Sequence, residues 1–167
     1  MNQIGQHMAE DHRELQALLK RLAEDALAPE AAALHCTWCE LESRLLGHLA
    51  AEEHYLLPLI EASHPTEAAR IVAEHGQIRR QVSELGVAIE LHTVRQPAID
   101  ELIRTLQTHA QYEDQTLYLL AGDKASPLLQ QRISARLKSA MRLAQSASTK
   151  LASGMSHHRP AAGRTQP

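Results

Sequence analysis

The chain has 167 residues, of which 44% are apolar and 22% charged, and its formal net charge is −3 with histidine neutral. That length suits one domain with a real core, and the charge argues against a nucleic acid or an anionic membrane as the partner. No apolar stretch approaches the length of a bilayer-spanning helix, the first residues do not resemble a secretory signal, and two cysteines cannot build a disulfide framework. We therefore expect a protein of the reducing cytoplasm.

The composition and periodicity predict an all-α fold. Leu, Ala, Glu, Gln and Arg favour helices, and apolar residues recur with helical spacing, as at Leu15, Leu18, Leu19 and Leu22. The expected helices cover residues 3–27, 30–62, 66–94, 98–121 and 127–148.

Prolines punctuate this pattern. Pro29, Pro65, Pro97 and Pro127 each stand where a helix can begin, and Pro58 should kink or shorten the second helix. Short connections make neighbouring helices antiparallel, which predicts an up-down four-helix bundle with an additional C-terminal helix.

The end of the chain has a different composition. Ser, Ala, Gly, Thr and Pro dominate from about residue 146, which predicts a disordered tail. We therefore expect one domain over residues 1–148 and a tail over residues 149–167.

The chain contains a weak internal repeat. The stretch MAEDHRELQALL around His12 is similar to IVAEHGQIRRQV around His75. His48 follows the first histidine by 36 residues, and His109 follows the second by 34. The spacing indicates two helical hairpins that pack face to face.

Each hairpin also carries a histidine and a glutamate four residues apart. These are His48 and Glu52 in HLAAEE, and His109 and Glu113 in HAQYED. Residues at this spacing share one face of a helix, and leucines flank His48 on that face, so it should point inward. Because a buried unpaired carboxylate costs several kcal/mol, these groups need a compensating charge. A pair of metal ions would supply it.

Counting coordination positions favours two irons. Two octahedral ions offer about twelve positions. Two bridging carboxylates would fill about four, four imidazoles about four and an oxo or hydroxo bridge about two, which leaves about two for a small ligand. Sets of histidine and carboxylate suit iron, with manganese and zinc as alternatives.

The order His, His-x-x-x-Glu, His, His-x-x-x-Glu resembles the hemerythrin-like, or HHE cation-binding, family over roughly residues 7–121. The stretch HLAAEEHYLLPLI is similar to the second-helix signature of that family, including the double glutamate and the later proline. The resemblance implies a non-haem diiron centre in a four-helix bundle. It implies as metal ligands His12, His48, Glu52, His75, His109 and Glu113.

One departure from the oxygen-carrying hemerythrins bears on function. Those proteins have two histidines four residues apart on the third helix, whereas Ile71 and Arg79 flank His75 at that spacing here. The pattern is closer to hemerythrin-like proteins linked to peroxide breakdown, nitric oxide response, oxygen sensing or iron handling. Two hypotheses remain open: a diiron enzyme that decomposes peroxide, and a sensor, carrier or store for oxygen, nitric oxide or iron.

Two tyrosines lie near the expected ligands in the sequence. Tyr55 follows Glu52 by three residues on the same helical stripe, so it could donate a hydrogen bond at the centre or ligate iron. Its alternative is an ordinary core tyrosine. Tyr112, three residues after His109, is a weaker candidate for supporting the ligands.

The stretch HCTWC offers a rival site, because Cys36 and Cys39 form C-x-x-C beside His35. A thioredoxin-like redox motif would need a surrounding βαβ pattern, and a zinc site would need a fourth ligand. The sequence predicts neither. The alternative is a helical turn with two small thiols, so the role of the cysteines stays open.

Overall fold

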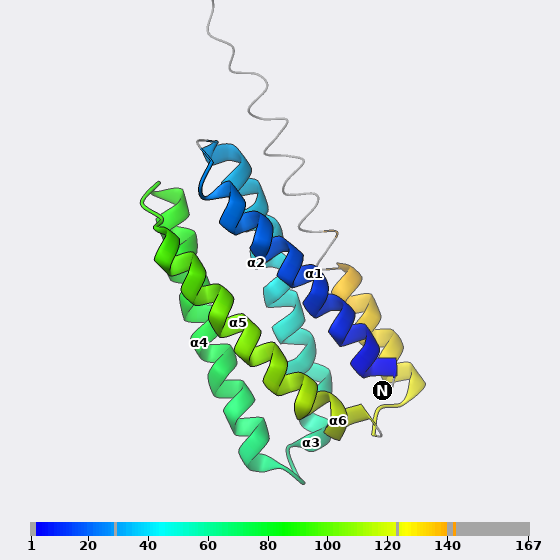
Figure 1. Cartoon of the computed structure of the whole chain (residues 1–167). Helices are drawn as coiled ribbons and strands as arrows, with labels where there is room; N and C mark the ends of the chain where they lie inside the picture. Colours follow the sequence, from blue (N-terminus) through cyan, green and yellow to red (C-terminus); the bar gives the residue numbers. More distant parts are fainter. Residues whose placement is uncertain (1–2, 29, 123, 140–141, 143–167) are drawn as a thin grey trace, which may run out of the picture.

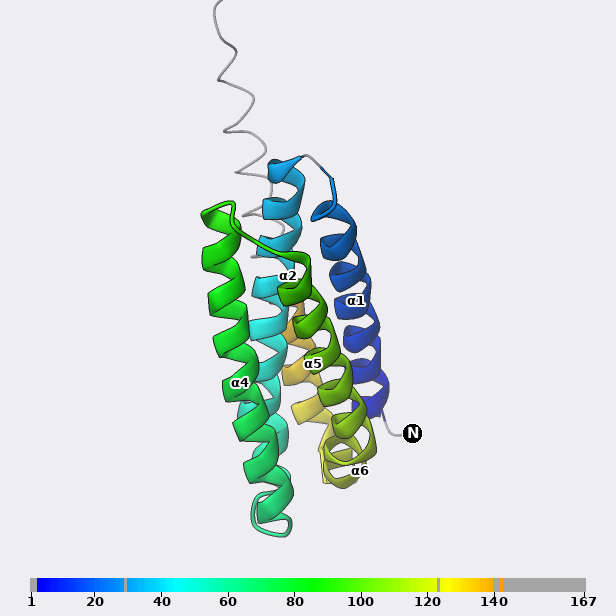
Figure 2. The same cartoon turned by 60° about the vertical axis from the view of Figure 1, so that its left-hand side comes forward.

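The structure, a computed structural model, describes residues 3–28, 30–122, 124–139 and 142. Four long helices run alternately up and down and form the bundle (Figure 1, Figure 2): α1 (Gln3–Asp25), α2 (Ala31–Ala51), α4 (Pro65–Glu90) and α5 (Gln96–Gln115). α1 and α4 each pack against both α2 and α5. The prediction of an all-α, up-down four-helix bundle is confirmed.

A π-turn interrupts the second long helix. The chain passes from α2 into η1 (Glu52–Leu56) and then α3 (Leu57–Ile60), and the Leu57 N–H bonds to the carbonyl of Glu52. In a regular helix the ring of Pro58 would clash with the carbonyl four residues earlier. The wider π-turn therefore accommodates the proline without ending the helix, and it contains Glu52.

α4 ends four residues earlier than its expected end at residue 94. His92 adopts a left-handed backbone with φ 54. Its N–H bonds to the Ile89 carbonyl at 3.0 Å, and the Thr93 N–H bonds to the Ala88 carbonyl at 2.8 Å. This pair of bonds is a Schellman cap, with histidine where glycine is usual, so the sequence lacked the common stop signal.

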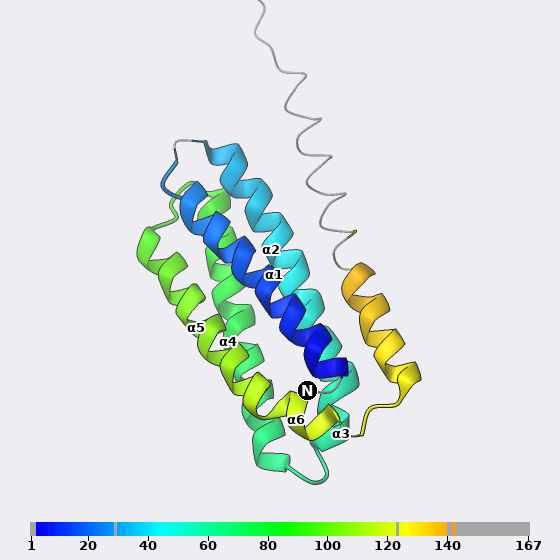
Figure 3. The same ribbon diagram turned by 45° about the vertical axis from the view of Figure 1, so that its right-hand side comes forward.

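The expected continuous helix over residues 98–121 is wrong at one place. The backbone of Thr116 leaves helical geometry, with φ −128 and ψ −73. The chain then turns into α6 (Leu117–Gly122), which lies across the end of the bundle beside α3 (Figure 3). This break redirects the side chains that follow Thr116.

Helical residues 127–139 form the additional C-terminal helix, which lies beside the N-terminal part of α1 (Figure 3). Ile133 and Leu137 bury their side chains there, at 1% and 8% exposed. The expected continuation of this helix to residue 148 and the tail over residues 149–167 lie outside the described residues, apart from residue 142, which is helical. No helix in the described part of the chain is long and apolar enough to span a bilayer.

The core consists of two apolar clusters with a polar layer between them. The upper cluster, on the side of the α1–α2 connection, contains sixteen buried residues that include Leu19, Leu45 and Ile99. The lower cluster contains twelve that include Met8, Ile60 and Ile133. The site described next occupies the layer between these clusters.

Candidate metal centre

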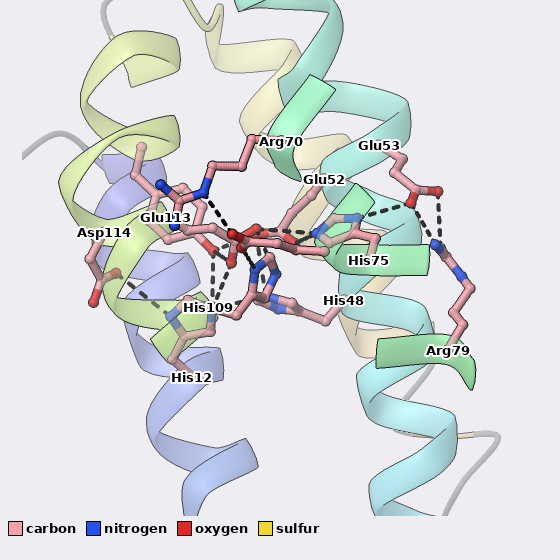
Figure 4. A network of polar contacts seen from close by, with 12 residues as sticks. His12, His48, Glu52, Glu53, Arg70, His75, Arg79, His109, Glu113 and Asp114 are labelled. Atoms are coloured by element: carbon pink, nitrogen blue, oxygen red, sulfur yellow. Dashed lines mark hydrogen bonds and ion pairs between the residues drawn. The ribbon is translucent and has the colours of Figure 1, made fainter. Parts of the chain in front are cut away.

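Six polar side chains meet in this layer (Figure 4). None is more than 7% exposed, although all six are ionisable. They are His12 from α1, His48 from α2, Glu52 from η1, His75 from α4, and His109 and Glu113 from α5. The structure thus brings together every ligand expected from the sequence.

The four histidines form two pairs, and each glutamate faces one histidine of each pair. Glu52 Oε1 lies 3.3 Å from His48 Nε2, while its Oε2 lies 3.4 Å from His75 Nε2. Glu113 Oε2 lies 3.5 Å from His12 Nε2, while its Oε1 lies 3.1 Å from His109 Nε2. The six residues therefore form two groups that share both glutamates: one contains His12 and His48, the other His75 and His109. We call these the His12–His48 half and the His75–His109 half.

The spacing of the ligand atoms fits metal coordination. Two atoms about 2.1 Å from one ion and at right angles are about 3.0 Å apart. His12 Nε2 and His48 Nε2 are 3.0 Å apart, and His75 Nε2 lies 3.3 Å from Glu113 Oε1. Among the described residues, Glu52 Oε2 and His109 Nε2 are buried with no hydrogen-bond partner. Because orphaned buried polar atoms are costly, a cation between these atoms would compensate for them.

The outer nitrogen of three imidazoles contacts a carboxylate. His48 Nδ1 lies 2.7 Å from Asp11, His75 Nδ1 2.9 Å from Glu53, and His109 Nδ1 2.8 Å from Glu74. A carboxylate accepts hydrogen bonds, so it fixes the proton of a neutral imidazole on Nδ1. The lone pair of Nε2 then points into the centre, which is the arrangement that metal-binding histidines show.

Arginines hold these three carboxylates in turn. Arg44 Nε donates to Asp11 at 3.0 Å, Arg79 Nη1 donates to Glu53 at 2.6 Å, and Arg70 Nε donates to Glu74 at 2.7 Å. Figure 4 shows two of these arginines, Arg70 and Arg79, on the rim of the site. Arg79 occupies one of the positions where oxygen-carrying hemerythrins would have the additional histidine. Here it supports His75 through Glu53 instead.

His12 is held more loosely than the other three histidines. Its Nδ1 lies 3.6 Å from Asp114, whose side chain is 49% exposed. No arginine pairs with Asp114 in the part of the chain that the structure describes. The two halves of the centre therefore differ in how firmly their ligands are oriented.

The charges of the site shift the pKa values of its members. Burial alone lowers the pKa of His75, but Glu113 and Glu52 outweigh burial and raise that pKa to about 10. Burial alone raises the pKa of Glu113, but His109, His12 and His75 hold it well below the usual range. The carboxylates draw protons onto the imidazoles for the reason that they would attract a cation, so protons and metal ions compete for this site.

The structure adds a residue that the sequence did not indicate, Tyr118 on α6. Its side chain is 3% exposed, and its hydroxyl donates to Glu52 Oε1. The same oxygen lies 3.1 Å from His12 Nε2 and 3.5 Å from Glu113 Oε2. In a straight helix Tyr118 would point roughly 140° away from Glu113, since each residue turns by about 100°. The break at Thr116 brings it back to the site, and nothing in the local pattern predicts that.

The two tyrosines considered from the sequence lie farther out. Tyr55 is half-buried and packs edge-on against His54, with ring centroids 4.6 Å apart. Tyr112 is also half-buried, and the Arg70 guanidinium lies 3.6 Å above its ring. The contact with Arg70 connects Tyr112 to the carboxylate that orients His109.

The cysteines form no metal cluster with their neighbours in the described residues. Cys39 Sγ lies 3.8 Å from His35 Nδ1, while His35 Nε2 contacts Glu90 at 2.5 Å. Both thiols are free and half-buried, and burial together with Glu42 raises the pKa of Cys39. The rival site therefore has a histidine but lacks a converging set of ligands.

A small cavity lies on the upper side of the centre, between α1, α2 and α5. Its volume is about 20 Å³, and leucines of the upper cluster, including Leu15, Leu45 and Leu106, form much of its lining. His12, His48 and His109 also line it, as do Gln16 and Gln107. One water-sized molecule needs about 10–15 Å³ by this measure, so the cavity admits only a very small ligand.

Comparison with known proteins agrees with this geometry. The family described as the hemerythrin HHE cation-binding domain matches residues 4–121. No curated protein and no solved structure gave a match. The matched region contains all six converging residues and Tyr118, and the buried set of histidines and glutamates fits a metal site. The chain belongs to the hemerythrin HHE cation-binding family and contains a metal-binding domain of that family.

Proposed function

We propose that the protein holds a non-haem diiron centre through His12, His48, Glu52, His75, His109 and Glu113 and binds a small uncharged molecule there. The observation that carries the proposal is that, in each glutamate, one carboxylate oxygen faces a histidine of one half and the other oxygen faces a histidine of the other half. A carboxylate whose oxygens face different histidine pairs suits two ions better than one. Iron is the expected metal, with manganese and zinc as alternatives.

The residues of the chain have distinct tasks in this proposal. Glu52 and Glu113 would hold both ions and offset their charge. His48, His75 and His109 would ligate through Nε2, because Asp11, Glu53 and Glu74 keep the proton on Nδ1. When bound, a pair of irons supplies redox-active positions at which small molecules exchange electrons.

The cavity selects among ligands. Leucines form much of its lining, although Gln16, Gln107 and three histidines also line it, and burying a charge against apolar side chains is costly. Its volume of about 20 Å³ admits a molecule with two heavy atoms, such as oxygen, nitric oxide or hydrogen peroxide. The ligand class is therefore small and neutral.

The first experiment is elemental analysis of the protein purified without a histidine tag, with an absorption spectrum of the same sample. We expect about two irons per chain and charge-transfer bands from iron. Zinc or no metal, persisting after anaerobic reconstitution with iron, would contradict the diiron proposal.

A second experiment distinguishes an enzyme from a binder. Hydrogen peroxide is added to the iron-loaded protein, and released oxygen is measured over many cycles, two peroxides giving one oxygen and two waters. Sustained release without loss of iron would show a peroxide-decomposing enzyme. Reversible spectral changes with oxygen or nitric oxide and no sustained release would show a carrier or sensor.

A further inference from the structure

We infer that Tyr118 is a seventh protein ligand of the metal centre, that it binds the ion of the His12–His48 half, and that one position for a small ligand remains on the other ion. The inference deepens the proposed function and rests on it. The family order of histidines and glutamates does not contain this residue.

The Tyr118 hydroxyl lies among the expected ligand atoms. The hydroxyl oxygen donates to Glu52 Oε1, lies 3.1 Å from His12 Nε2 and lies 3.5 Å from Glu113 Oε2. These three residues belong to the group that could hold one ion together with His48. Atoms at neighbouring positions of one octahedral ion are about 3 Å apart, so the phenol oxygen occupies a place that a ligand would take.

The ring of Tyr118 packs among apolar side chains, which do not account for its hydroxyl. Tyr118 belongs to the lower apolar cluster, with Leu117 and Ala121 from its own short helix. It is 3% exposed, and its oxygen faces ligand atoms rather than solvent. Phenylalanine would fill an apolar cluster equally well, so the hydroxyl is the part of the side chain that packing does not explain.

The weak support of His12 agrees with this assignment. The other three imidazoles contact carboxylates that arginines hold. Among the described residues, the carboxylate paired with the outer nitrogen of His12 is that of the half-exposed Asp114, at 3.6 Å. An additional ligand would strengthen the less firmly oriented half. In binding a ferric ion, the phenol O–H bond breaks, an iron–oxygen bond forms, and the proton is released to solvent.

The position of Tyr118 also decides where a small ligand can bind. Tyr118 closes the centre from the lower cluster, while the cavity opens onto it from the upper cluster. With Tyr118 bound, the ion of the His12–His48 half has about six ligands, including a bridging solvent atom. The ion of the His75–His109 half would have about five. The cavity touches both halves, through His12 and His48 as well as His109, so the ligand count decides which ion keeps a position. The remaining position lies on that second ion.

The chain has three tyrosines, which permits a decisive spectroscopic test. Phenolate bound to ferric iron gives a visible charge-transfer band and enhanced ring vibrations in resonance Raman spectra. We expect both signals in the iron-loaded wild type and at full intensity in the double variant Tyr55→Phe/Tyr112→Phe, in which Tyr118 is the sole tyrosine. We expect neither in Tyr118→Phe.

Iron content is measured on the same samples. The failure of the Tyr118 assignment can therefore be distinguished from the failure of the diiron proposal. Two irons per chain with no phenolate signal in the wild type would overturn the inference and leave the diiron proposal intact. Loss of the signal in the double variant would also overturn it. If Tyr118→Phe does not fold, the wild type and the double variant still decide the question.

Titration with nitric oxide, which the cavity admits, tests the single open position. The iron-loaded wild type should saturate at one nitric oxide per chain. Saturation at two would overturn the assignment of one open position.

Discussion

The chemistry of this protein depends at the residue scale on chains of contacts that run from arginine to carboxylate to histidine. Arg44, Asp11 and His48 form one such chain, and all three residues are buried. Each chain fixes both the ring orientation and the position of the proton. The histidines are thus oriented by residues outside the group of six converging side chains.

Replacing a bridging carboxylate should remove the centre. We expect Glu52→Ala or Glu113→Ala to reduce bound iron from about two per chain to nearly none. We also expect either change to destabilise the fold by about 3–5 kcal/mol, because it leaves buried histidines without their charge partner. Elemental analysis and urea unfolding measure both effects, with exposed Glu61→Ala as the control. Full iron loading in both variants would exclude the bridging assignment.

The carboxylates that contact the outer nitrogens of the histidines should differ in their effect on iron affinity. Asp11 is 4% exposed and contacts both His48 and Arg44, whereas the side chain of Asp114 is 49% exposed. We expect Asp11→Asn to lower iron affinity by about 10–100-fold and Asp114→Asn to have a much smaller effect. Competition with a chelator measures both affinities, and equal losses would contradict the ranking.

Filling the cavity should slow ligand binding without removing iron. Leu106 lines the cavity, and Leu106→Phe adds volume there at a stability cost of about 1–3 kcal/mol. We expect two irons per chain and a slower reaction with nitric oxide. Stopped-flow absorbance measures the rate, and an unchanged rate would show that ligands enter by another route.

At the scale of elements, two irregularities in the helices shape the site. The π-turn accommodates Pro58 and contains Glu52, and the break at Thr116 turns α6 so that Tyr118 faces the ligands. Each lies at or near a glutamate that faces both halves of the site.

The C-terminal helix stabilises the bundle at this same end. Ile133 is 1% exposed within the lower cluster, so Ile133→Ala should reduce the free energy of unfolding by about 2–5 kcal/mol while two irons remain bound. Leu128, at 59% exposed, provides the matched control, and Leu128→Ala should change it by less than about 0.5 kcal/mol. Chemical unfolding measures both, and equal effects would mean that the helix does not pack as described.

At the scale of the whole molecule, the bundle places a layer of charge between two apolar clusters. Four histidines and two glutamates lie there, all buried. Such a layer is stable only while its charges are balanced, by protons or by metal ions. Metal binding and folding are therefore coupled in this protein.

This coupling predicts a difference in pH dependence. A histidine whose pKa rises from 6.5 to about 10 on folding contributes stability that is complete below pH 6.5 and is lost as pH rises toward 10. We expect the chelator-treated protein to lose thermal stability between about pH 7 and 10. The iron-loaded protein should change less over this range, because cations replace those protons. Differential scanning calorimetry measures both, and parallel profiles would contradict the coupling.

Acidic pH should release iron from the protein. The lowered pKa of Glu113 means that its stabilising charge is lost only well below the usual pKa of 4.5. Protons then compete with metal for the same atoms, so iron should dissociate as the pH falls.

Helical periodicity predicted the bundle, and the order of histidines and glutamates, through its family resemblance, predicted the six converging side chains. Helical periodicity and the four-residue spacing of His48 and Glu52 are local properties, because both depend only on the turn of one helix. Proline positions marked most helix starts, although His92 ended α4 without the usual glycine.

The contacts that orient these side chains follow from the packing of the helices and could not be predicted from the sequence. Asp11 and Arg44 meet across 33 residues of sequence, and the cavity forms between three helices. In a straight helix Tyr118 would face away from the site. It reaches the site because the chain leaves helical geometry at Thr116. These features depend on contacts between distant segments, which no local spacing encodes.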